Sequence, residues 1–435
     1  MIEEFISLFK TDLYLKIWGY TLETWAIWLP ILMTGLFFNT WFSYKRRQWI
    51  NSKEKILLEI KIPKEIDRSP AAMEVVFGGI FEPVVGSLTD VFLNGRVRYW
   101  FSFEMVSIGG DVRFFIWAFK DWKEILESRI YAQYPGVEIF EAKEDYALKV
   151  IYDPGRIDIW GATTKLNKAD AFPIKTYIGY ELDKGGKEQE EIVDPIMPLL
   201  EQLGSLKPGE QAWVQILIQA HRKEGFQDAR IFSKPDWQEG VKKEIRNIIE
   251  KESFVKPTKA TGDKESLPYM TFLTKTQDKT IEAIERNSAK PAFDTMMRFL
   301  YTAPTEIYNK GRIGGLLGSM RQFGSQNLNG IRPDWMSGID YPWKDFRDIR
   351  KKRNQKTFLE AYKRRSFFNV PFKHFHGKPF ILTTEELATV YHFPGRAITT
   401  PTLTRVPSKK AAAPSNLPVR EKNDEPDETH EGLPR

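Results

Sequence analysis

The feature that most constrains this chain is an uncharged apolar run from Thr24 to Tyr44. It contains about twenty residues, and a helix of that length crosses a hydrocarbon core about 30 Å thick. Trp25 and Trp41 lie near its two ends, where aromatic rings favour the membrane interface. Basic residues follow the run, which predicts that the C-terminal side faces the cytoplasm. The sequence therefore predicts a single-pass protein of the plasma (inner) membrane with its N-terminus outside.

Two alternatives to a membrane span are weaker. A buried helix of a soluble domain usually has a polar face, whereas this run offers only Thr34, Asn39 and Thr40. A cleaved signal peptide would have a basic start and a small-residue cleavage site, whereas Glu3 and Glu4 stand near this N-terminus. We expect an uncleaved anchor.

Composition limits what the rest of the chain can be. Its 435 residues, 42% apolar and 28% charged, suffice for two or three domains with cores and argue against several membrane spans. The chain has no cysteine, which excludes disulfides, thiol nucleophiles and cysteine-held metal sites.

Strand and helix patterns follow the span. Apolar, aromatic-rich runs on either side of Gly109-Gly110 predict a β-hairpin, and Asp121 is the expected N-cap of the next helix. In the second half we expect strands at 172–182, 210–221 and 290–303, and helices at 190–204, 237–252, 276–287 and 305–323. The fold class expected is α+β: one N-terminal transmembrane helix, two ferredoxin-like (split βαβ) units and a disordered tail.

The expected boundaries divide the chain into seven parts. They are an extracytoplasmic amphipathic segment (1–23), the transmembrane helix (24–44), a first α/β unit (53–150), a second α/β unit (151–335), a basic aromatic segment (336–378), a strand–helix docking motif (379–400) and a disordered Pro-rich tail (401–435).

The positive charge of the chain is local. The formal net charge is +6, and the stretch from Lys344 to Arg365 carries ten Lys or Arg residues against three acidic ones. Such a segment suits DNA, an anionic membrane surface or an acidic partner, but it is equally typical of an exposed, solvated helix. The candidate binding residues are Arg347, Arg350, Lys351, Lys352, Arg353, Lys356, Lys363, Arg364 and Arg365.

Catalytic signatures are absent from the sequence. It contains no GxxxxGK[ST] loop, GxSxG elbow or HExxH helix. His374 and His376 would lie on one side of a strand, but no third ligand is near in sequence, so we expect no metal site. We expect no cofactor and no enzymatic activity, although an enzyme of unrecognised type is a further hypothesis.

Four stretches carry a resemblance: RFLYTAP (298–304), FGSQNLNGIRP (323–333), ILTTEELATVYHFPG (381–395) and TPTLTRVPSKKAAAPSNLP (400–418). Together they resemble the membrane-side region ahead of the motor in conjugation and type IV secretion ATPases of the HerA/FtsK-like class. The resemblance implies a membrane-anchored α/β region next to a RecA-like motor. The 435 residues carry no motor motif, so the expected motor is a separate partner.

The leading hypothesis is thus a non-catalytic, membrane-anchored component of a type IV secretion or conjugation-like machine that docks a HerA/FtsK-type P-loop ATPase. The alternative is a membrane-tethered DNA-binding protein that acts through 344–365, and self-association into a homo-oligomer is left open. The candidate docking residues are Glu385, Glu386, Leu387, His392, Phe393 and Pro394.

Overall fold

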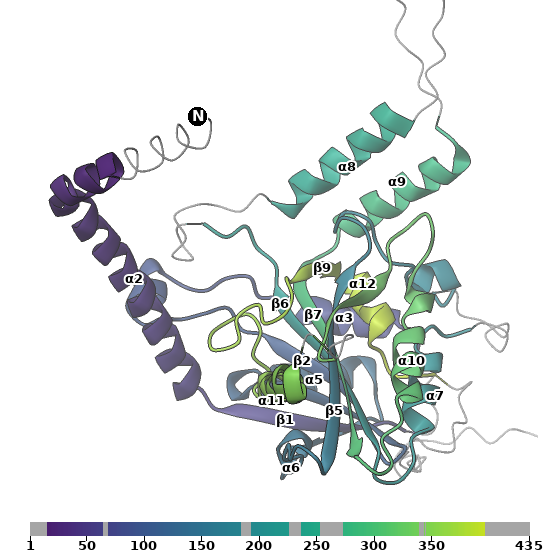
Figure 1. Ribbon diagram of the computed structural model, residues 1–435. Helices are drawn as coiled ribbons and strands as arrows, with labels where there is room; N and C mark the ends of the chain where they lie inside the picture. Colours follow the sequence, from purple (N-terminus) through teal and green to yellow (C-terminus); the bar gives the residue numbers. More distant parts are fainter. Residues whose placement is uncertain are drawn as a thin grey trace, which may run out of the picture.

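A computed structural model describes residues 15–63, 68–183, 193–225, 236–252, 273–338, 343 and 345–395. The expectations for 1–14 and for the tail at 401–435 lie outside the described residues. Within the described part, the chain forms a long N-terminal helix joined to one mixed α/β body (Figure 1).

The N-terminal helix α2 (Trp25–Ser52) contains the apolar run and extends beyond it. It is long and apolar enough to cross a membrane, and none of its most apolar stretch is buried in the protein. Ile31 is 70% exposed and Phe37 is 61% exposed, and the hydrocarbon core of a membrane would cover such apolar side chains. Figure 1 shows this part of α2 standing clear of the α/β body.

The body is built on one nine-stranded sheet. Its strand order is β4-β1-β3-β2-β6-β7-β5-β8, with β9 paired to β7. The pairs are antiparallel throughout. The strands are β1 (Lys55–Lys61), β2 (Phe101–Ile108), β3 (Asp111–Phe119), β4 (Glu138–Glu141), β5 (Ile157–Leu166), β6 (Gln211–Ala220), β7 (Ala292–Pro304), β8 (Ile331–Met336) and β9 (Phe380–Thr383).

The two expected units share this sheet. β2 pairs with β6 from Phe101 opposite Ile218 to Ile108 opposite Gln211, so the strands of both halves form one continuous surface. The expected mixture of helices and strands is therefore confirmed, and in the described part of the chain it takes the form of one body with one antiparallel sheet.

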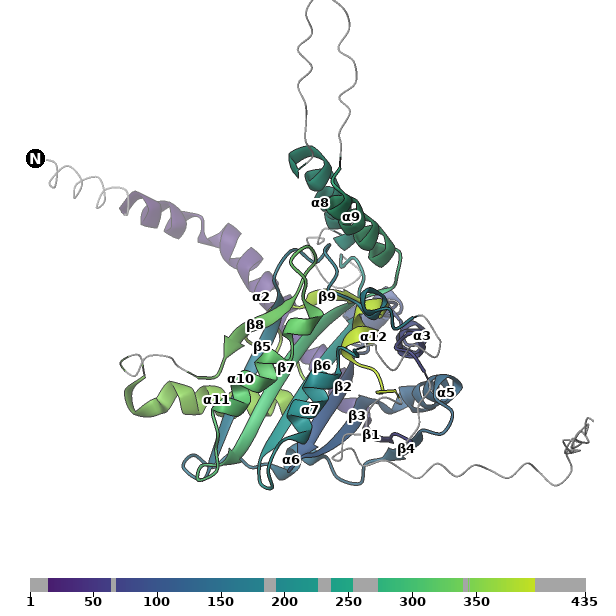
Figure 2. The same cartoon turned by 90° about the vertical axis from the view of Figure 1, so that its right-hand side faces the viewer.

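One face of the sheet is covered by helices from both halves (Figure 2). Alternate strand residues such as Phe103, Ile116 and Val214 point into this layer and are buried. The covering helices are α3 (Ala71–Gly79), α5 (Lys123–Gln133), α7 (Met197–Gly204), α10 (Gly311–Gly318) and α12 (Thr384–Val390).

The opposite face is covered by α6 (Tyr146–Lys149), α11 (Ile349–Lys363) and the chain after α11. Because both faces are covered, the central strands β2 and β6 are buried nearly throughout, and this includes polar side chains such as Glu104 and Gln215. Helices α8 (Trp237–Glu252) and α9 (Lys275–Ser288) form a separate pair with its own small core.

Several local expectations are confirmed. The hairpin forms with Gly109 and Gly110 at its turn, and Gly110 has φ +93 with space for no Cβ, since that atom would lie 2.7 Å from the Leu206 carbonyl oxygen. The expected strands at 210–221 and 290–303 correspond to β6 and β7, and the helix at 276–287 lies within α9.

Other local expectations are wrong. Residues 172–182 form a short 3₁₀ turn (Tyr177–Tyr180) in place of a strand, because the backbone N–H groups of Ile174 and Tyr177 donate to side chains of α12. The helix expected at 305–323 is reduced to α10, and the one at 190–204 to α7 within the described residues. Asp121 does not cap α5, because its carboxylate is bound by Lys53.

Candidate functional site

The candidate docking residues of α12 and its flank lie inside the body. Glu385, Glu386, Leu387, His392 and Phe393 are each at most 2% exposed. Pro394 is also buried. They are packed by segments far away in the sequence, so these six side chains are not exposed to a partner.

Glu385 and Glu386 hold α12 in place. The Glu385 carboxylate is bound by Lys290 at 2.8 Å and Arg286 at 3.2 Å. The Glu386 carboxylate accepts hydrogen bonds from the backbone N–H groups of Ile174 and Thr383, each at 2.9 Å. Burial raises the pKa of Glu386 to about 7, although these hydrogen bonds act in the opposite direction.

His392 forms a buried pair with Asp194. Its Nε2 lies 3.0 Å from Asp194 Oδ2, and its Nδ1 lies 2.8 Å from the Ala388 carbonyl oxygen. Burial lowers the pKa of His392, but the Asp194 carboxylate outweighs burial and raises the pKa above its ordinary value. The pair ties the end of α12 to the start of α7.

The candidate basic residues are split between surface and core. Most of them line the outer side of α11 or flank it, where Arg350, Lys352 and Arg353 are exposed. Arg347, Lys356 and Arg364 are also exposed, whereas Lys351 and Lys363 are half-buried. Arg365 is 1% exposed and is therefore not available to a ligand.

Arg365 joins α11 to the sheet through a buried charge network. Its Nε and Nη2 each lie 3.0 Å from a Glu104 carboxylate oxygen, and it also pairs with Asp145. Glu104, on β2, is fully buried and accepts further hydrogen bonds from Ser102 and from Tyr146. Burial alone would lower the pKa of Arg365, but the Glu104 carboxylate raises it, so the guanidinium stays charged.

The N-terminal end of α11 presents exposed apolar side chains. Trp343 is 79% exposed, Phe346 74% and Ile349 61%. The Asp345 carboxylate fixes this end by accepting hydrogen bonds from the backbone N–H groups of Arg350 and Lys351 at 2.8 and 2.7 Å. We call Trp343, Phe346, Arg347, Ile349 and Arg350 the α11 tip.

Helix α2 and the body meet at a closely packed junction. The Phe42 ring of α2 lies 5.3 Å from the Phe92 ring of α4 (Leu88–Phe92). Gly95 has φ +70, and a Cβ there would lie 2.3 Å from the Lys45 carbonyl carbon, so only glycine fits against the helix backbone.

Polar contacts close the same junction at the C-terminal end of α2. Lys53 Nζ lies 2.6 Å from Asp121 Oδ2, and the Tyr99 hydroxyl donates to the same oxygen at 3.0 Å. The hydrogen bond with Asp121 raises the pKa of Lys53, and the hydrogen bond with Lys53 lowers the pKa of Asp121. Because Ile50 is also buried, the body begins directly where the helix ends.

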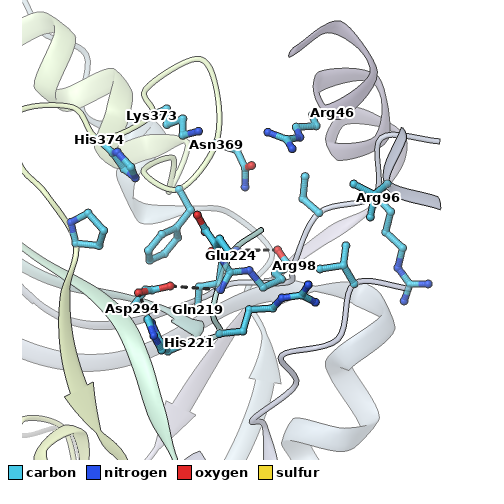
Figure 3. A pocket seen from close by; sticks show the side chains of 16 residues that line it. Arg46, Arg96, Arg98, Gln219, His221, Glu224, Asp294, Asn369, Lys373 and His374 are labelled. Carbon is cyan, nitrogen blue, oxygen red and sulfur yellow. Dashed lines mark hydrogen bonds and ion pairs between the residues drawn. The ribbon is translucent and has the colours of Figure 1, made fainter. Parts of the chain in front are cut away.

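A pocket of about 100 Å³ lies beside this junction (Figure 3). It collects residues from α2, from the chain before β2, from β6 and β7, and from the loop after α11. Its charged and histidine side chains are Arg46, Arg96, Arg98, Arg222, Lys373, His221, His374, Glu224 and Asp294.

The floor of the pocket is internally paired. Arg98 binds Glu224 and lies 3.3 Å from Asp294 Oδ2, and it donates to the Ala220 carbonyl oxygen at 2.7 Å. His221 Nδ1 lies 2.8 Å from Asp294 Oδ1. Its Nε2 is buried and has no hydrogen-bond partner in the part of the chain that the structure describes.

Sequence analysis missed this pocket because its cations come from distant positions. Arg46 belongs to the basic residues that follow the apolar run, and His374 was considered only as a metal ligand. The remaining members are single residues at the ends of strands and in loops, which no local pattern distinguishes.

The two histidines of the KHFHGK stretch do not share a strand. His376 stacks on Trp335 with ring centres 3.9 Å apart, and His374 lies 5.6 Å from the Phe367 ring. Among the described residues, no three His, Asp or Glu side chains are grouped closely enough to hold a metal ion.

Comparisons with known proteins give a family without a known function. A search of curated proteins finds no significant match. A family model described as a domain of unknown function, DUF8128, matches residues 45–405. That match begins at the last turns of α2, spans the whole α/β body and covers well over half of the chain, so the protein belongs to the DUF8128 family.

Proposed function

We propose that this protein is a non-catalytic, membrane-anchored component of a type IV secretion or conjugation-like machine, and that it docks a HerA/FtsK-type ATPase. The observation that carries the proposal is the junction between α2 and the body. Phe42, Lys45, Ile50 and Lys53 all contact the body, so the span cannot swing freely as it would on a flexible linker. A body that is held in a fixed position relative to α2 can serve as a rigid platform for a partner.

The sequence resemblance supports the choice of partner. The stretches at 298–304, 323–333 and 381–395 fall on β7, on the chain leading into β8, and on β9 with α12. They therefore form part of the centre of the body. On this proposal the resemblance reflects a shared scaffold, and the contact with the ATPase is made elsewhere.

We propose the α11 tip as that contact. Exposed aromatic and arginine side chains are enriched at the centres of protein interfaces, and the tip combines both. α11 is also firmly fixed to the sheet through Arg365, which lowers the entropic cost of presenting the tip.

The strand order supports an ancestral duplication of one α/β unit within the body. Counted from each outer edge of the sheet, the halves run β4-β1-β3-β2 and β8-β5-β7-β6. In both halves, the strand that comes first in the sequence is second in the sheet, and the strand that comes third in the sequence is third in the sheet. This is the order of a ferredoxin-like unit, and we propose two such units fused through β2 and β6.

Co-purification of variants tests the docking proposal. The full-length protein, solubilised gently from membranes, should lose most of the bound P-loop ATPase when Trp343→Ala and Phe346→Ala are combined. The matched control is Tyr131→Ala on α5, which removes an aromatic ring that is 44% exposed elsewhere on the surface. Equal ATPase recovery from the tip variant and the control would refute the α11 tip as the contact.

A second candidate function is DNA binding through the outer side of α11, favoured by the exposed Arg350, Lys352 and Arg353. Phosphate contacts make binding fall with salt, by about 0.9 log units in affinity per log unit of salt for each contact. Reversing Arg350, Lys351, Lys352 and Arg353 to Glu should abolish DNA retention. Retention with an unchanged salt slope would exclude this function.

A further inference from the structure

A row of aromatic rings connects the apolar run of α2 to the body. The centre of the Phe38 ring lies 5.9 Å from that of Phe42, and the centre of the Phe42 ring lies 5.3 Å from that of Phe92 on α4. Phe38 and Phe42 both belong to the apolar run, which ends at Tyr44. The short helix α4 therefore lies against the last turns of this run.

The level of α4 along α2 follows from two contacts. Phe92 contacts Phe42, whereas a Cβ at Gly95 would lie 2.3 Å from the Lys45 carbonyl carbon. The three residues from Gly95 back to Phe92 thus follow three residues of α2, or about 4.5 Å at a rise of about 1.5 Å per residue. On the proposal that α2 spans the membrane, Gly95 lies just beyond the hydrocarbon core and α4 lies at its boundary.

The segment around α4 is apolar on two sides. Its inner side packs on the body, where Val85 and Val91 are each 4% exposed. On its outer side, Val84 is 62% exposed, Leu88 49% and Leu93 59%. Single exposed apolar side chains are common on protein surfaces. Three of them in one short segment, next to an exposed apolar helix, indicate a surface that binds something apolar.

The exposed leucines lie next to the contact with α2. Leu88 comes four residues before Phe92, so their side chains lie on the same side of α4. Leu93 follows Phe92 directly, as the C-cap residue. The two leucines therefore continue the apolar surface that begins on α2.

The polar groups of α4 are bonded within the segment. Ser87 Oγ accepts a hydrogen bond from the Asp90 N–H at 3.3 Å, and Asp90 Oδ2 accepts one from the Ser87 N–H at 3.0 Å. The Asn94 amide donates to Asp90 Oδ1 at 3.2 Å. Because these groups have partners, the segment can leave bulk water at a lower cost. The charge on Asp90 limits it to the membrane interface, since a charge in the hydrocarbon core is costly.

We propose that Val84, Leu88 and Leu93 bind the lipid bilayer at the boundary between hydrocarbon and headgroups, on the side where the body lies. Apolar side chains that leave water at this boundary hold amphipathic segments on membranes. The contact lies beside the point where α2 leaves the bilayer and limits the tilt of the body relative to the membrane. The inference rests on the membrane anchoring of the proposed function but not on the docking of an ATPase.

Quenching of a fluorescent label in vesicles tests the inference. The sequence has no cysteine, so Leu88→Cys or Leu93→Cys provides a single labelling site in the full-length protein, reconstituted into phosphatidylcholine vesicles. Lipids with a nitroxide near the headgroup end of the acyl chain should quench both labels. Iodide, present on both sides of the vesicle, should quench them several-fold less than it quenches the control label.

The matched control is Leu148→Cys on α6. Leu148 is 62% exposed, and Figure 1 shows α6 at the end of the body away from the apolar part of α2. A label there should respond to iodide and not to the lipid nitroxides. Equal responses at 88, 93 and 148 would overturn the inference.

A label at Phe37→Cys tests the membrane span separately. Phe37 lies in the apolar run, and lipids with a nitroxide deep in the acyl chain should quench a label there if α2 spans. Absence of this quenching would contradict the anchor, and with it both the proposed function and this inference. Quenching at 37, together with responses at 88 and 93 like those of the control, would overturn the bilayer contact alone.

A protein bound to this surface would give a different result. Labels at 88 and 93 would then be shielded from iodide but not quenched by the lipid nitroxides, and a second copy of the chain or another protein would replace the bilayer as the occupant. Thermal unfolding like that of the unsubstituted protein checks the fold of each variant. Val84→Cys provides a third position if a leucine variant fails this check.

Discussion

Replacing Arg365 with methionine tests the idea that buried charges fix α11 to the sheet. The change removes the cation that lies 3.0 Å from both oxygens of Glu104 and leaves that carboxylate buried without a counter-charge. Breaking a buried pair from one side typically costs about 3–5 kcal/mol. We expect Arg365→Met to lower the free energy of unfolding by about that amount.

A double-mutant cycle separates the pair from its surroundings. Glu104→Gln alone should cost about 1–3 kcal/mol, because Arg365 keeps its contact with Asp145. The double variant should be more stable than the sum of the single changes predicts, with a coupling of about 1–3 kcal/mol. Arg364→Met is the control, since the Arg364 side chain is 62% exposed and its loss should matter by less than about 0.5 kcal/mol.

Urea unfolding of the full-length protein in detergent, followed by tryptophan fluorescence, provides the measurement. The fluorescence of Trp100 and Trp213 should change when the packing under α11 is lost, because both side chains are buried in the apolar cluster that α11 covers. A cost of Arg365→Met below about 1 kcal/mol, or equal to that of Arg364→Met, would refute the reasoning.

Three further predictions concern other parts of the body. Glu386 and His392 both hold protons more tightly in the folded protein, with reference pKa values of 4.5 and 6.5 in the unfolded chain. The contribution of Glu386 to the free energy of unfolding is complete below pH 4.5 and is lost as the pH rises through about 7. The contribution of His392 is complete below pH 6.5 and is lost as the pH rises through the pKa of the folded state, which is raised. Thermal unfolding should therefore show falling stability from pH 5 to 8, and His392→Gln should flatten the upper part of that slope. Gly95→Ala should lower the free energy of unfolding by about 1–3 kcal/mol or more, because a side chain there collides with Lys45. It should also make the segment around Gly95 more sensitive to limited proteolysis in membranes, and unchanged cleavage would contradict the packed junction. Arg298→Met should lower the free energy of unfolding by less than about 3 kcal/mol, because burial lowers the pKa of Arg298 to about 9 and no described residue bonds its buried Nε, although the Ala361 and Ser366 carbonyl oxygens lose their Nη donors; a larger loss in urea unfolding would contradict this.

The sequence predicted best the elements whose signals are local. The helix of the apolar run and the Gly109-Gly110 hairpin depend on spacing within a few residues, and each forms as expected. The helix of the basic segment also appears, with Phe358 and Tyr362 on its buried side.

Long-range contacts explain where prediction failed. Glu385 and Glu386 have the pattern of first-turn acids on an exposed helix, but Lys290 and Asn287, about a hundred residues earlier, enclose them. Residues 172–182 have strand-like alternation, yet their N–H groups are taken by α12. Arg365 belongs to a charge run in sequence, while Glu104 draws it into the core.

The candidate pocket could not be predicted for a related reason. Its cations come from α2, from the chain before β2 and from two loops, and only the fold of one continuous sheet brings them together. The join between β2 and β6 depends on two edges meeting, which the pattern of either strand alone does not reveal.

The most direct test of the central claim is quantitative cross-linking in membranes of the native host. The sequence has no cysteine, so a single cysteine placed at Ile349 in the α11 tip is the only thiol in this chain. Cross-linking with a short bifunctional reagent, followed by purification and mass spectrometry, should recover a P-loop ATPase of the HerA/FtsK type attached at that site. A cysteine at Tyr131 should recover none. Recovery of the protein without any ATPase from both sites would contradict the account.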